Sequence, residues 1–246
     1  MDVQDFHRQP ASYKLEWALA TGLLIFILAF LLLPFHQNRH KAGTPQCKRN
    51  LKQIGLALHN YNADYGCLPP AFLTDPQGAP TLSWRVLILP YLDESALFHR
   101  FNLDQRWDSP ENIKLLSEMP SVFRCPRHAE NDRKPLKETH YLVPVGAETA
   151  FPYAECVPIR DIKDGTSNCL LVVEDPEFSV PWSAPTDVTA GDWISHLAAT
   201  HRKVSHTDGQ FVLVGDGTVR FLRYDTAPKT LHALLSISDG APVGPF

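Results

Sequence analysis

The chain has 246 residues, of which 44% are hydrophobic and 20% are charged. These values are ordinary for a folded protein and exclude global disorder. The formal net charge of −4 excludes a broadly basic nucleic-acid binder, because phosphate binding depends on clustered Lys and Arg. The 21 prolines break helices and fix loops, which favours short strands and loops over a helical bundle.

An apolar stretch follows a tail of residues 1–14. Residues 17–33 read WALATGLLIFILAFLLL and carry no charge. As a helix rising about 1.5 Å per residue they reach roughly 26 Å, near the lower limit for crossing a bilayer. The sequence therefore predicts a transmembrane helix over residues 15–35. A cleaved signal peptide is the alternative, but acidic residues outnumber basic ones before the stretch and no small-residue cleavage site follows it.

The flanking charges bear on the orientation of this helix. More basic residues follow it than precede it, and by the positive-inside rule this excess leaves the large domain in the cytoplasm. Long domains, however, are translocated largely regardless of flanking charge. The charges alone therefore do not decide on which side of the membrane the domain lies.

Beyond the anchor, the pattern predicts a hinge over residues 36–45 and a soluble domain over residues 46–246, because Gly43 and Pro45 interrupt the chain. An amphipathic helix is expected over residues 46–65, since apolar residues recur at spacings of three and four. The apolar face consists of Leu51, Ile54, Leu58, Tyr61 and Tyr65. Gly66 is a suitable C-cap for this helix.

The rest of the domain divides into two parts. Residues 66–138 predict a mixture of short helices and loops, with a helix start at Ser109 and Pro110. Residues 139–246 predict a β-rich part. Two β-branched runs flank the Asp216-Gly217 pair, which is typical of a hairpin. Residues 211–214 are all apolar, so this strand is expected to be covered on both faces.

The five cysteines carry no C-x-x-C spacing, so neither a zinc knuckle nor a redox pair is indicated. One or two disulfides, with one thiol left over, are expected if the domain is exported. Buried free thiols are the alternative.

Several motifs occur together in a fixed order. Residues 47–61 read CKRNLKQIGLALHNY, and the segments SWRVLILPYLD, RWDSPEN, FRCP, IKDGTSNCLLVVED, VPWSAPTDV and ALLSISDG follow. They resemble the DUF1559 family, which is abundant in planctomycete bacteria. His206, nine residues and then Asp216-Gly217 reproduce the H-X9-DG motif, which is described for that family as associated with prepilin-type processing.

This resemblance implies an α+β fold in which the transmembrane and amphipathic helices precede a pseudopilin-like antiparallel sheet with short helices. It also implies that the large domain lies outside the cytoplasmic membrane, which overrules the charge count. The family's leader departs here, because residues 12–15 are not its apolar stretch, so we expect an uncleaved anchor. A disulfide between Cys47 and Cys125 is implied because both lie in family segments.

His206 and Asp216 are the first candidates for chemistry. An imidazole and a carboxylate near one hairpin can bind a metal or orient a partner group. The structural alternative is that Asp216 and Gly217 shape a tight turn and His206 bonds a loop carbonyl. Carboxylates in the Asp-Gly turns can also gather around calcium, but no D-x-D-x-D-G loop exists, so we expect no cofactor.

A second group joins acidic and aromatic residues. Glu174 and Asp187 lie near Trp182 and Trp193 in the sequence, and carboxylates beside aromatic rings suit sugar binding or acid–base chemistry. Strand-end acids and tryptophans that cover a core explain the same pattern. The common hydrolase and nucleotide-binding motifs are absent from the sequence.

The sequence therefore predicts a non-enzymatic cell-envelope protein that acts through protein or surface interactions. Its expected partners are the membrane and either envelope proteins or sister subunits, not nucleic acid. One alternative is an extracytoplasmic solute- or carbohydrate-binding module, as an older label of the family suggests. The other is a metal-dependent enzyme that uses His206 and Asp216.

Overall fold

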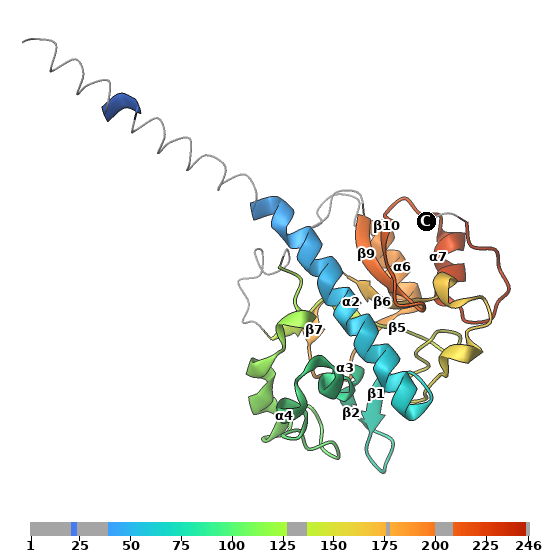
Figure 1. Cartoon of the computed structure of the whole chain (residues 1–246). Coiled ribbons are helices and arrows are strands. Elements are labelled where there is room, and N and C mark those ends of the chain that lie inside the picture. Colours follow the sequence, from blue (N-terminus) through green and yellow to red (C-terminus); the bar gives the residue numbers. More distant parts are fainter. Residues whose placement is uncertain (1–20, 24–38, 127–136, 176–177, 200–208, 245–246) are drawn as a thin grey trace, which may run out of the picture. The chain divides into compact units, whose positions relative to one another are not determined.

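The computed structural model describes residues 21–23, 39–126, 137–175, 178–199 and 209–244 (Figure 1). The described part has an α+β fold with mostly antiparallel strand pairs and short helices, as predicted. The chain divides into two compact units, Met1–Ala42 and Gly43–Phe246. No helix within the described ranges has the length and apolar character needed to span a membrane. The helix predicted over residues 15–35 lies outside those ranges except for residues 21–23.

The larger unit combines one long helix, several short helices and ten short strands within the described residues. The α-helices are α2 (Arg39–Tyr65), α3 (Trp84–Leu87), α4 (Ser95–Phe98), α6 (Ala190–Ala199) and α7 (Pro228–Leu235). The 3₁₀ helices are η2 (Leu89–Leu92), η3 (Asn112–Glu118), η4 (Ser121–Phe123), η5 (Ile159–Asp161) and η6 (Thr166–Asn168). The strands are β1 (Phe72–Thr74), β2 (Pro80–Ser83), β3 (Glu138–Thr139), β4 (Tyr141–Leu142), β5 (Pro144–Val145), β6 (Leu170–Glu174), β7 (Val180–Pro181), β8 (Val188–Thr189), β9 (Gly209–Val214) and β10 (Val219–Arg223).

The central feature is a four-stranded antiparallel sheet with the order β10-β9-β6-β4. Every residue of β9 is buried, which confirms the prediction from its uninterrupted apolar run. The predicted hairpin is also confirmed, since β9 and β10 pair through the turn that contains Asp216 and Gly217. The remaining strands form pairs of two, and β5 with β8 is a parallel pair.

Helix α2 lies across one face of this sheet (Figure 1). Leu51, Ile54 and Leu58 are fully buried, which confirms this part of the predicted apolar face, whereas Tyr65 at the end of the helix is 65% exposed and does not belong to it. Gly55 permits a close approach, because a Cβ there would lie 2.7 Å from the Cδ1 atom of Leu213 in β9. Gly66 ends the helix with a positive φ of 79°, as expected of a C-cap.

Helix α2 begins at Arg39 rather than at residue 46 and contains Pro45. It therefore runs through most of the segment that was expected to be a broken hinge. Proline removes a single backbone donor, and here the helix continues past it. A proline in the sequence predicts a helix boundary, but this prediction takes no account of the packing of the following turns against the sheet.

Two hydrophobic clusters lie on opposite faces of the sheet. The first joins α2 to β6 and β9 and to the segments between α3 and η4. The second packs α6 and α7 against the other face. Neither α6 nor α7 was predicted, because the region after residue 139 was expected to be β-rich. The sheet is thus a middle layer, and only the face toward α2 carries the family's opening segment.

Two disulfides hold α2 at both of its ends. One joins Cys47 near the start of the buried part of the helix to Cys125, which is the pair that the resemblance implies. The other joins Cys67, just after the helix, to Cys156. Cys169 is free and buried. Two later segments of the chain, around Cys125 and Cys156, are thereby joined covalently to α2 and to the residues just after it.

Removal of either disulfide is expected to lower the free energy of unfolding by about 2–4 kcal/mol, because each closes a long loop of the unfolded chain. The variants are Cys47→Ser with Cys125→Ser, and Cys67→Ser with Cys156→Ser, compared by urea unfolding. Cys169→Ala is the control and should cost about 1 kcal/mol. Peptide mapping without reduction should recover the two pairs, and any other pairing would contradict this fold.

Candidate functional site

The first of the predicted acids, Asp187, is part of a buried ion pair. Its Oδ1 atom lies 2.6 Å from Nη2 of Arg85, and the two side chains are 2% and 0% exposed. Arg85 also donates to the carbonyl of Tyr141 at 2.9 and 3.1 Å and to Oγ of Ser83 at 2.7 Å. Asp187 accepts from the backbone N–H of Val143 at 2.9 Å. The pair therefore joins α3 to strand β4 and to Val143, which lies between β4 and β5.

Burial opposes the charge on both partners of this pair. It lowers the pKa of Arg85 and raises the pKa of Asp187, while the attraction between the two acts against both shifts. Arg85 also lies over the ring of Trp84, with its guanidinium carbon 4.8 Å from the ring centroid. The side-chain nitrogens of Arg85 and both carboxylate oxygens of Asp187 form hydrogen bonds inside the protein. Asp187 therefore has a structural role in the fold.

Trp182 and Trp193 are both fully buried. Trp182 stacks on Phe123, with ring centroids 5.9 Å apart and an interplanar angle of 18°. Its Nε1–H donates to the carbonyl of Leu116 at 3.1 Å. Trp193 belongs to the cluster on the opposite face of the sheet. Neither ring has an exposed face on which a sugar could stack, so the two do not form the platform that the carbohydrate alternative requires.

Glu174 is buried beside the disulfide at the start of α2. One of its carboxylate oxygens and the sulfurs of Cys47 and Cys125 lie within 4.8 Å of one another. Because the sulfurs are bonded to each other, they are not the thiolates that a metal ion requires. Burial and the carboxylate of Glu174 raise the pKa of Tyr141 well above its ordinary value. Glu174 thus belongs to an interior polar cluster.

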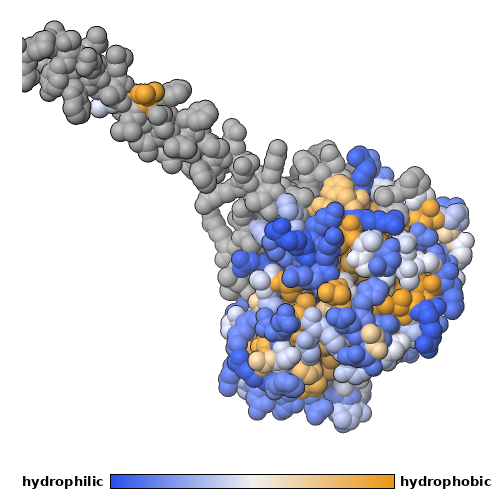
Figure 2. All heavy atoms as spheres, in the orientation of Figure 1, coloured by the Kyte–Doolittle hydropathy of each residue, from blue (hydrophilic) through white to orange (hydrophobic). Residues whose placement is uncertain are grey.

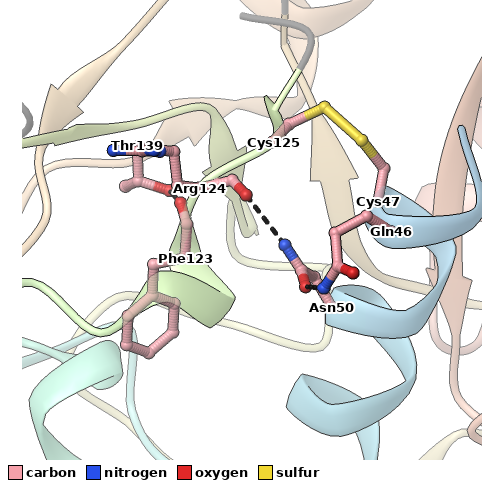
Figure 3. Close-up of a disulfide and its surroundings, with 7 residues drawn as sticks. All are labelled: Gln46, Cys47, Asn50, Phe123, Arg124, Cys125 and Thr139. Atoms are coloured by element: carbon pink, nitrogen blue, oxygen red, sulfur yellow. Dashed lines mark hydrogen bonds between the residues drawn. A yellow bond between two sulfur atoms is a disulfide. The ribbon is translucent and has the colours of Figure 1, made fainter. Parts of the chain in front are cut away.

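Asn50, which the sequence reasoning missed, belongs to the same region (Figure 3). It is 1% exposed, and its Nδ2 donates to the carbonyl of Arg124 at 2.8 Å. Its Oδ1 accepts from Nε2 of Gln46 at 2.8 Å. The available signal in the sequence was an asparagine on the side of the amphipathic helix that was expected to face the sheet. It links α2 to the segment that carries Cys125 by a hydrogen bond next to the covalent one.

A second pair, whose acid was among the carboxylates near the tryptophans in the sequence but whose histidine was missed, lies on the other face of the sheet. Asp175 follows β6 and is fully buried, and its Oδ2 lies 2.7 Å from Nδ1 of His196 in α6. The side chain of His196 is 35% exposed. The Glu174-Asp175 sequence gave the only signal, because adjacent residues of a strand end point to opposite faces. Asp175 and His196 thus attach α6 to the strand.

The Asp216-Gly217 turn is well ordered by its own hydrogen bonds. Asp216 Oδ1 accepts from the backbone N–H and the hydroxyl of Thr218 at 2.8 and 2.6 Å, and Oδ2 accepts from Ser167 at 2.7 Å. Partial burial opposes the charge on Asp216, but these hydrogen bonds prevail and lower its pKa. Gly217 has a φ of 79°, which favours glycine. His206 lies outside the described residues.

A hollow of about 500 Å³ lies between this turn and α2. Lys48, Lys52, Leu56 and His59 line it from the helix, and Asp216, Gly217, Thr218 and Val219 line it from the hairpin. His59 approaches the turn closely, since a Cβ on Gly217 would lie 3.4 Å from its Nε2 atom. That nitrogen is buried and has no hydrogen-bond partner in the described part of the chain. The opening family segment, residues 47–61, and the Asp216-Gly217 motif therefore line the same hollow.

Leu56 is 63% exposed in this setting. Figure 2 shows hydrophilic residues over much of this face of the larger unit, with hydrophobic residues in smaller patches between them. A second, smaller hollow of about 240 Å³ borders Leu56 on its other side and is lined by Gln53, Tyr91 and Glu94 among others. The outward face of α2 thus combines two lysines with an exposed leucine.

The fold and these contacts define a class of protein: an α+β domain in which a helix held by two disulfides lies across an antiparallel sheet. The chain belongs to the family described as protein of unknown function (DUF1559), whose model matches residues 37–157. The matched segment contains α2 and all four disulfide cysteines. No curated protein and no solved structure matches the chain.

The buried ion pair yields a stability prediction. Asp187→Ala should lower the free energy of unfolding by about 3–5 kcal/mol, because it leaves the charge of Arg85 buried and unpaired. Asp108→Ala, which removes the exposed partner of Arg106, is the matched control and should change little. Urea unfolding measures both. A small effect of Asp187→Ala, equal to that of the control, would show that the pair is not closed in solution.

Proposed function

We propose that this chain is a membrane-anchored, non-enzymatic protein of the cell envelope with pseudopilin-like architecture, which acts through interactions at its surface. The contact surface is the hollow between α2 and the hairpin of β9 and β10, together with the outward face of α2. The observation that carries this proposal is the separation of roles among the polar side chains. Glu174 and Asp187 have buried side chains that interact inside the protein, whereas Lys48 and Lys52 of the opening family segment are exposed.

The first support concerns the predicted chemical residues. Asp187 neutralises Arg85, Asp216 accepts hydrogen bonds from Ser167 and Thr218, and Trp182 is a core residue. Each has a structural task that a substrate would have to disrupt. By contrast, Lys48 and Lys52 are exposed on α2 beside the hollow. An interaction at the surface uses the residues that the fold leaves available.

The second support concerns the compartment. Disulfides form and persist in oxidising environments, and the chain contains two of them. The uncharged apolar residues 17–33 precede the domain and favour insertion into a bilayer. A long helix followed by an antiparallel sheet that it crosses is the arrangement expected of a pseudopilin-like protein. These features together favour an anchored domain on the outer side of the cytoplasmic membrane.

A fusion experiment tests the location. Alkaline phosphatase fused after Phe246 should be active, because the enzyme needs export to form its own disulfides. The matched control is the same fusion without residues 1–35, which should be inactive because the predicted anchor is missing. An inactive full-length fusion, together with a fluorescent cytoplasmic fusion at the same position, would refute the proposed location.

A ligand screen tests the non-enzymatic, interaction role against the solute-binding alternative. The melting temperature of the full chain should not change with calcium, zinc or a panel of mono- and disaccharides. A ligand at 100 times its dissociation constant would stabilise the native state by about 2.7 kcal/mol, which calorimetry detects readily. Stabilisation by a sugar would favour the solute-binding role, and stabilisation by a metal that depends on Asp216 would favour the metal-dependent enzyme.

A further inference from the structure

Strand β10 is an edge of the central sheet, and β9 is the only one of the described strands with which it pairs. The bond from the N–H of Val214 to the carbonyl of Thr218, at 3.0 Å, fixes which residues of β10 face β9. In an antiparallel ladder the residues alternate. Arg220 therefore turns its backbone groups toward β9, and Val219 and Phe221 turn theirs outward. An outward row of N–H and C=O groups can pair with another extended chain.

The hollow lies beside this edge. Lys48, Lys52 and Leu56 follow one another at intervals of four residues, so they form one flank of α2. That flank faces Thr218 and Val219, where β10 begins. Phe221 lies on the same face of the sheet as Val219, because the two are two positions apart along the strand, and it is 37% exposed. The helix flank and the strand edge thus border the same space.

From this arrangement we infer that an extended acidic peptide segment of another envelope protein pairs with β10 and occupies the hollow beneath the lysine flank of α2. A further strand would run roughly 4.8 Å beyond β10. Its side chains on the α2 side would then reach Lys48, Lys52 and Leu56. Such strand addition takes its affinity from backbone hydrogen bonds and its selectivity from alternate side chains.

The charges around the hollow determine the kind of peptide. Two lysines line it, and the only carboxylate among the lining residues is that of Asp216. Both oxygens of Asp216 already accept hydrogen bonds from Ser167 and Thr218, so this acid does not neutralise the lysines at close range. Acidic side chains at alternate positions of the peptide would pair with Lys48 and Lys52.

The same features favour a peptide over an anionic lipid or polysaccharide. Only a polypeptide in extended form offers the alternating N–H and C=O groups that the β10 edge requires. Leu56 and Phe221 add exposed apolar surface for β-branched side chains between the acids. The inference rests on the proposed interaction role, because it names the partner class of the same surface.

The probe is an acetylated and amidated octapeptide of alternating Asp and Val, measured by fluorescence anisotropy with the full chain in detergent. It should bind, and Lys48→Glu with Lys52→Glu should weaken binding at least about tenfold through charge reversal. Lys229→Glu is the matched control, since Lys229 is exposed but lies in α7 away from the hollow lining, and it should leave binding unchanged. A Lys-Val octapeptide should not bind.

Backbone pairing is tested separately from charge. The same acidic peptide with N-methyl groups at alternate residues should not bind, because it lacks the donors of one edge. Phe221→Pro should also abolish binding, since it removes an outward N–H while leaving the pairing with β9 intact. Hydrogen exchange should slow at Val219 and Phe221 when the unmodified peptide is added.

Three outcomes would overturn the inference: no binding of the acidic peptide, equal binding of its N-methylated form, or binding only to phosphatidylglycerol vesicles. The second outcome would mean non-specific attraction of anions, and the third would mean a lipid surface. Because the peptide assay uses purified protein, it can fail while the phosphatase fusion is active. An inactive fusion with intact peptide binding would instead refute the location alone.

Discussion

The two disulfides that hold α2 on the sheet are the constraint on which the rest of the structure depends. Cys47–Cys125 lies near the start of the buried part of the helix and Cys67–Cys156 just beyond its end. With both ends attached, α2 can approach β9 closely at Gly55, and its buried side presents Leu51 and Ile54 to the sheet. The hollow beside α2 follows from this placement, because the flank of the helix extends next to the Asp216-Gly217 turn.

The buried pair of Arg85 and Asp187 performs a related task without a covalent bond. It lies in the layer between α3 and the strands, where each charge would be costly alone. The guanidinium of Arg85 also donates to the carbonyl of Tyr141, and the carboxylate of Asp187 also accepts from the N–H of Val143. These bonds satisfy the hydrogen-bonding capacity that the ion pair does not use. Two segments that resemble the family, SWRVLILPYLD and VPWSAPTDV, meet through these two side chains. Their polar residues therefore shape the fold rather than a ligand site.

Sequence reasoning identified the features whose cause is local. The spacing of Leu51, Ile54 and Leu58 revealed the buried face of α2, and the apolar residues of β9 revealed a strand covered on both sides. It did not identify the partner of Asp187, because the two residues of the pair are 102 positions apart. The helices α6 and α7 were missed although both are amphipathic, because the whole region after residue 139 was expected to be β-rich. The hollow could not be predicted, since it exists only between α2 and a hairpin distant in sequence.

The division between buried and exposed polar residues has a consequence for function. A charged or polar side chain inside the core lowers stability unless it is paired, so Asn50 and Arg85 are explained once their partners are known. Lys48 and Lys52 make no such contribution to the core, yet they belong to the same family segment as Asn50. Stability therefore explains the buried members of that segment but not the lysines. Their position beside a strand edge is the basis of our proposal that they belong to a surface that another polypeptide contacts.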